Sequence, residues 1–124
     1  MTDGLIPDEV RSFVLQRIDT VAQLEALLLL RKYPQTSWSA ADVARRLYVG
    51  EAAAQEILAK LATDGLIAAA DGAFRYSPAA ETARIIDALA DTYARYLIPV
   101  TNLIHDKPSR IQQFADAFRI RKDK

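Results

Sequence analysis

The chain has 124 residues, no cysteine, and 16 basic against 16 acidic side chains, so its formal net charge is zero. With 51% hydrophobic and 26% charged residues, the composition excludes a disordered chain and a collagen-like one, and the lack of cysteine excludes disulfides and zinc-thiolate sites. A chain of this length can bury about two-thirds of its surface, which is enough for one domain. Apolar runs such as Ala26 to Leu30 are far too short to span a bilayer, and no signal peptide is visible, so we expect a cytoplasmic protein.

Two helices are predicted in the first third of the chain. Pro7 and the two acidic residues after it fit a helix start, and apolar residues then recur at helical spacing, which predicts a helix over about 7–17. Thr20 followed three residues later by Gln23 is the pattern of a capping box for a second helix. This second helix is apolar nearly all round, so we expect it to be central, and Pro34 ends it.

Two more helices are predicted in the middle of the chain. After a brief extended segment at 36–38, Ser39 with an acidic residue three positions on marks the start of a helix over about 40–47. A further helix is predicted from about Glu51 to Thr63. Gly65 ends that helix in the manner of a left-handed cap.

The pattern then changes from helix to hairpin and back. Leu66 to Ala70 and Ala73 to Tyr76 are short strand-like runs separated by Asp71-Gly72, a strong signal for a two-residue hairpin turn. From residue 79 to about 105 the pattern is helical again, with a kink expected at Pro99.

The end of the chain is its one clearly basic segment. Residues 107–124 carry 6 basic and 2 acidic side chains. A last amphipathic helix is predicted from Ser109 to about Arg119. Its apolar stripe consists of Ile111, Phe114, Ala115 and Phe118.

The predicted order of elements is that of a winged helix-turn-helix. The run DVARRLYVGEAAAQEILAKLATDGLI, followed by AAADGAFRYSP, resembles that family in the style of MarR-like and related bacterial regulators. The resemblance covers about residues 20–78. It implies a mainly α fold with a small β-hairpin, in which residues 1–19 add an N-terminal helix and residues 79–124 a C-terminal helical dimerisation segment with a basic tail.

The resemblance also implies that the helix over 51–63 enters the major groove of duplex DNA, while the preceding helix and the hairpin hold phosphates. The candidate DNA-binding residues are Ser39, Arg45, Arg46, Ala52, Ala53, Gln55, Lys60 and Arg75. Among the polar residues near the start of that helix, Gln55 can pair with adenine, whereas phosphates would repel Glu51 and Glu56. The acidic helix could equally be a protein-docking face, and the two adjacent arginines could belong to an ordinary solvated helix face.

A second pattern lies in the segment 79–105. Apolar and tyrosine residues recur there in steps of three and four over nearly three heptads, which favours a dimerisation seam over a helix that only covers the domain. The residues of this seam are Ile86, Leu89, Tyr93, Tyr96, Val100 and Leu103.

No motif for catalysis is present. The single histidine, His105, stands beside Asp106 at a predicted helix end, and the sequence has no phosphate-binding glycine loop, metal-spaced cluster or nucleophile elbow. We therefore expect neither an enzyme nor a bound cofactor or metal. The leading hypothesis is a homodimeric DNA-binding transcriptional regulator, and the rival is a winged-helix protein-interaction module that does not bind DNA.

Overall fold

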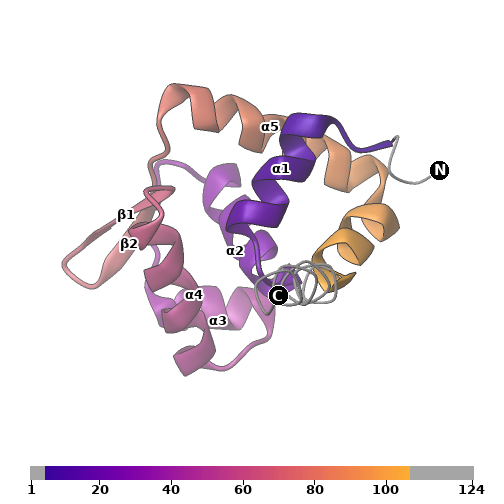
Figure 1. Ribbon diagram of the computed structural model, residues 1–124. Coiled ribbons are helices and arrows are strands. Elements are labelled where there is room, and N and C mark those ends of the chain that lie inside the picture. Colours follow the sequence, from indigo (N-terminus) through magenta and orange to yellow (C-terminus); the bar gives the residue numbers. More distant parts are fainter. Residues whose placement is uncertain (1–4, 107–124) are drawn as a thin grey trace, which may run out of the picture.

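The computed structural model describes residues 5–106, and within them the chain is mainly helical with one small antiparallel sheet, as predicted (Figure 1). The elements are α1 (Asp8–Arg17), α2 (Val21–Lys32), α3 (Ala40–Leu47), α4 (Glu51–Thr63), β1 (Ile67–Ala70), β2 (Ala73–Tyr76) and α5 (Ala80–Arg95). A further helical stretch covers 97–106. The predicted tail helix and its basic residues lie outside the described residues. In the part of the chain that is described, no helix is both long enough and apolar enough to cross a membrane.

The predicted caps position α2 and α3. The Thr20 hydroxyl accepts a hydrogen bond from the Gln23 amide at 3.0 Å, and Ser39 accepts one from the amide three residues later at 3.1 Å. The Gln23 side chain differs from a capping box, because its Oε1 accepts from the Asp19 amide at 2.8 Å rather than from Thr20. Its Nε2 donates to the Arg17 carbonyl at 3.0 Å, so this buried side chain ties the end of α1 to the start of α2.

The hairpin has the predicted turn. β1 and β2 pair in antiparallel register from Ile67 opposite Tyr76 to Ala70 opposite Ala73. Asp71 and Gly72 between them have φ of 54° and 77°, the positive values that a two-residue hairpin turn of type I′ requires. On the other edge of β2, Trp38 exchanges two backbone hydrogen bonds of 2.8 Å with Phe74. The segment before α3 therefore joins the sheet through a single antiparallel β-bridge.

One hydrophobic core joins all parts of the described chain. It takes residues from every helix and from the hairpin, and α2 contributes its buried face at the centre, where Leu24, Leu27 and Leu30 have no exposed surface. Burial of each such leucine stabilises the fold by about 1.5–3 kcal/mol relative to leaving it in water. α1 packs against α5, while α4 packs against both α2 and α3.

The C-terminal helix differs from the prediction of one continuous helix with a kink at Pro99. The chain leaves helical geometry at Tyr96, with φ −130° and ψ 59°, and a new helix follows at 97. The reason is that the ring of Pro99 would clash with the carbonyl four residues earlier, at Arg95, if the helix continued. In the new helix Pro99 lies in the first turn, where a backbone N–H would have no partner within the helix, so the lack of an N–H in proline costs no hydrogen bond.

Candidate functional site

The outer face of α4 contains the predicted DNA-reading positions. α4 buries Ala54, Leu58 and Leu61 against the core. Its exposed residues include Glu51, Ala52, Ala53, Gln55, Glu56 and Ala59. The structure therefore places Ala52, Ala53 and Gln55 at the surface, and it places two carboxylates among them.

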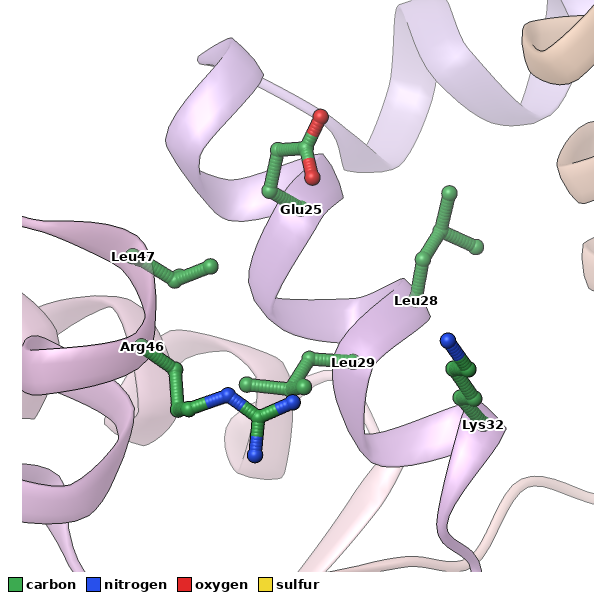
Figure 2. A pocket seen from close by; sticks show the side chains of 6 residues that line it. All are labelled: Glu25, Leu28, Leu29, Lys32, Arg46 and Leu47. Atoms are coloured by element: carbon green, nitrogen blue, oxygen red, sulfur yellow. The ribbon is translucent and has the colours of Figure 1, made fainter.

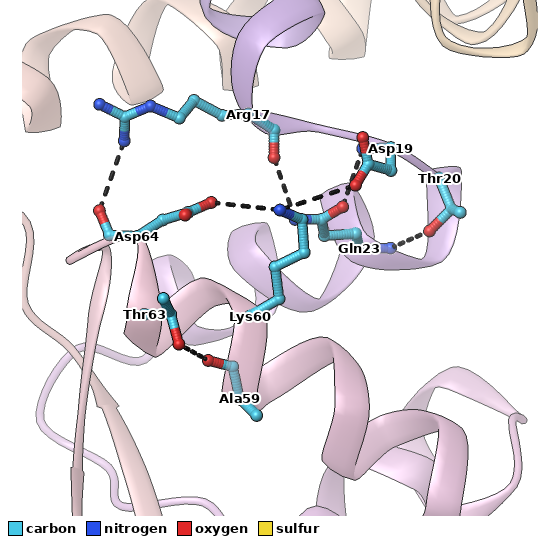
Figure 3. Close-up of polar contacts among 8 residues, drawn as sticks. All are labelled: Arg17, Asp19, Thr20, Gln23, Ala59, Lys60, Thr63 and Asp64. Atoms are coloured by element: carbon cyan, nitrogen blue, oxygen red, sulfur yellow. Dashed lines mark hydrogen bonds and ion pairs between the residues drawn. The ribbon is translucent and has the colours of Figure 1, made fainter. Parts of the chain in front are cut away.

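The basic residue of α4 is engaged by the protein itself (Figure 3). The Lys60 Nζ lies 3.7 Å from a carboxylate oxygen of Asp19 and 3.8 Å from one of Asp64. Arg17 completes this junction by donating to the Asp64 carbonyl at 3.4 Å. Exposed ion pairs of this kind contribute little stability, but they hold the cation at the junction of α1, α2 and the end of α4.

Other predicted phosphate-binding residues also have protein contacts. Arg45 pairs with the Asp42 carboxylate one turn earlier on α3. Arg75, on β2, donates from its Nη2 to the Gln35 carbonyl at 3.4 Å. The Ser39 hydroxyl serves as the cap of α3. The Arg45 pair and the Ser39 cap are local, whereas the Arg75 contact joins residues 40 positions apart and leaves its guanidinium without a carboxylate partner among the described residues.

Arg46 contacts aromatic rings rather than a carboxylate. Its guanidinium lies 5.4 Å from the centre of the Trp38 ring and 5.6 Å from that of Tyr33, a cation–π arrangement, and within residues 5–106 it has no carboxylate partner. Lys32 approaches the same Tyr33 ring at 5.6 Å. Hydrogen bonding by Arg46, together with the positive charge of Lys32, lowers the pKa of Tyr33 below its ordinary value.

A pocket of about 290 Å³ lies beside this cluster, between α2 and α3 (Figure 2). It is lined by Glu25, Leu28, Leu29, Lys32, Arg46 and Leu47. The Glu25 carboxylate accepts a hydrogen bond of 2.6 Å from the Tyr93 hydroxyl of α5. Burial and this hydrogen bond raise the pKa of Tyr93 to about 12.

The predicted dimerisation seam lies mostly inside the chain's own core. Four of its members are buried against other elements of the same chain: Ile86, Leu89, Val100 and Leu103. Tyr93 is half-buried against Glu25, and Tyr96 is half-buried at the helix break. An apolar stripe shows that a helix face will be covered but not by what, and here α1 and the rest of the core cover it. Most of the side chains that would form a dimer interface at this seam are therefore not exposed. Self-association of the chain stays a prediction.

The sequence analysis missed one conspicuous surface residue. Tyr48, the C-cap of α3, has φ 58° and is 94% exposed. The left-handed conformation costs a non-glycine residue about 1–2 kcal/mol, and glycine or asparagine is the usual occupant of such a helix end. The signal that could have identified Tyr48 is its position: a bulky residue stands directly after the predicted helix end at Leu47, where glycine or asparagine is usual.

Among residues 5–106 no three His, Asp or Glu side chains come together closely enough to hold an ion. His105 is exposed and lies beside Asp106 in the last helical stretch.

Comparison with known proteins adds little to this geometry. No family model and no curated protein matches the sequence. Among solved structures, the chain is similar to the S-adenosylmethionine-dependent methyltransferase SibL in its apo form, with 27% identity and a TM-score of 0.48. The match covers 63% of this chain and 22% of SibL, so this chain spans only about a fifth of that protein. At that TM-score the likeness supports no conclusion about fold or activity.

Proposed function

We propose that the segment from α2 to β2 is a winged-helix unit that binds a protein partner through the outer face of α4. The observation that carries this proposal is the charge of that face. Glu51 and Glu56 are exposed on it, and the one basic residue of α4, Lys60, is already ion-paired. A helix that enters the major groove lies between two rows of phosphates, which favour cations and repel carboxylates.

The shape of the same face suits a protein partner. Ala52, Ala53 and Ala59 leave a flat surface with little side-chain entropy to lose, so another backbone can approach closely. The two glutamates beside them favour a partner with basic groups around a small apolar patch.

Tyr48 adds an anchor at the start of this face. It lies two residues before Gly50, the N-cap of α4, and it combines an exposed aromatic ring with an unfavourable backbone conformation. Tyrosine is enriched among the residues that dominate binding energy at protein interfaces. A strained residue with no packing role in its own chain supports a role in binding.

The winged-helix part of the proposal is supported by the order of elements. Three helices are followed by a hairpin with a tight turn, and the bridge between Trp38 and Phe74 fixes the segment before α3 to β2. DNA binding by a transcriptional regulator is the second candidate. Arg46 and Arg75, which have no carboxylate partner among the described residues, are the observation in its favour.

Photo-cross-linking in the cell of origin tests the proposed docking face. A photo-reactive amino acid replaces Ala53 on α4, and in the matched control it replaces Ala94, an exposed alanine of α5. We expect a discrete protein adduct from position 53 and none from position 94, and Glu56→Lys in the same chain should suppress the adduct. Equal adducts from both positions, or a nucleic-acid adduct from position 53, would contradict the proposal.

A further inference from the structure

The pocket between α2 and α3 has an apolar floor that the fold leaves open. Leu28 and Leu29 of α2 and Leu47 of α3 line it, and all three are only partly buried at the edge of the core (Figure 2). At about 290 Å³ the pocket is at the lower end of the range for small-molecule sites. Its size therefore suits a small ligand with an apolar body of up to about eight carbon atoms.

Two cations lie at one end of this floor. Arg46 extends from α3, and Lys32 lies one turn beyond Leu28 on α2 (Figure 2). Within the described part of the chain neither has a carboxylate partner, and both lie against the ring of Tyr33. Two cations that line one pocket without a carboxylate partner favour an anionic ligand there.

The opposite end of the pocket carries a negative charge. Glu25 is seven residues before Lys32 on α2, which places it roughly 10 Å away along the helix axis. Its carboxylate already accepts the hydrogen bond from Tyr93. A second anionic group on the ligand would be repelled at that end.

We propose that this pocket binds a small monocarboxylate with an apolar chain. The carboxylate accepts hydrogen bonds from Arg46 and Lys32, and the chain covers Leu28, Leu29 and Leu47. Arg46 is suited to this contact because its planar guanidinium can donate two parallel hydrogen bonds to one carboxylate. The site is independent of the proposed docking face, because its lining comes from α2 and α3 and includes no residue of α4.

Calorimetry of the full chain with octanoate tests the site, and two ligands of the same length serve as controls. Octanamide keeps the apolar chain without the charge, and octanedioate adds a second carboxylate. We expect saturable binding of octanoate and at least tenfold weaker binding of both controls. Trp38, the one tryptophan of the chain, should report the same event by its fluorescence because its ring stacks on Arg46.

Two variants locate the binding. Arg46→Gln should weaken octanoate binding by at least tenfold and Lys32→Gln by several-fold, whereas Arg45→Gln, next to the pocket but paired with Asp42, should leave it unchanged. Lys32→Gln decides the question if Arg46→Gln fails to fold. The proposal is wrong if octanoate gives no saturable signal up to about 10 mM, if octanamide binds equally well, or if the folded variants at positions 32 and 46 retain full affinity.

Discussion

Truncation of Leu89 to alanine tests whether the apolar stripe of α5 is core or interface. Leu89 has no exposed surface within its own chain. A buried leucine replaced by alanine costs about 2–5 kcal/mol, because the lost transfer energy and the cavity add. Natural domains have only about 5–15 kcal/mol of stability. With a urea dependence of roughly 2 kcal/mol per molar, the unfolding midpoint should fall by about 1–2.5 M.

Urea denaturation at two protein concentrations provides the assay. We expect the midpoint of Leu89→Ala to be lowered equally at both concentrations, since Leu89 is buried by residues of its own chain. The control Leu97→Ala, at a position 50% exposed, should cost less than about 1 kcal/mol. If Leu89 were instead covered by a second copy, stability would depend on protein concentration. A midpoint that rises with concentration in the unmodified chain and loses that dependence in Leu89→Ala would refute the reasoning.

Three further predictions concern single contacts. The pKa of Tyr93 is raised from 10.0 to about 12, so the neutral phenol stabilises the fold fully below pH 10 and this contribution is lost as the pH rises toward 12. In denaturant titrations, Tyr93→Phe should therefore flatten the curve of stability against pH between these two values. An unchanged slope in the variant would contradict the assignment. Tyr48→Gly should raise the free energy of unfolding by about 0.5–1 kcal/mol by removing backbone strain, whereas a loss of stability would show that the tyrosine ring packs in its own chain. Ser39→Ala should lower thermal stability by about 1 kcal/mol through loss of the α3 cap, and Ser39→Thr should retain most of it; equal losses in both would show that the hydroxyl is not the cap.

Local sequence signals predicted most of the fold because they depend on neighbours in the chain. Ser39 and Thr20 are helix caps whose partners lie three residues away, so the starts of α2 and α3 follow from spacing alone. Asp71-Gly72 tolerates the positive φ of the hairpin turn, which sets the register of β1 and β2. The helix was predicted to kink at Pro99 but ends at Tyr96, because the proline ring clashes with the carbonyl of the preceding turn.

The candidate site was harder to predict because it depends on contacts between distant residues. Composition shows that Lys60 is basic, but not that Asp19, 41 positions earlier, lies beside it. The stacking of Arg46 on Trp38 and Tyr33 requires the end of α2 and the extended segment to meet α3. The apolar stripe of residues 86–103 was interpreted as a dimerisation seam, yet four of its six residues lie in the chain's own core. Periodicity cannot distinguish that core from a second copy.

Binding of the full chain to mixed-sequence duplex DNA, measured by fluorescence anisotropy at 50 and 200 mM salt, tests the central claim most directly. If the outer face of α4 docks a protein, we expect no saturable DNA binding at 200 mM salt and only weak binding at 50 mM. A DNA-binding regulator would bind with an affinity that falls steeply with salt, by about one unit of slope for each phosphate neutralised. Tight binding of this kind, with its slope reduced by about 1 in each of Arg46→Ala and Arg75→Ala, would contradict the proposal and establish the rival function.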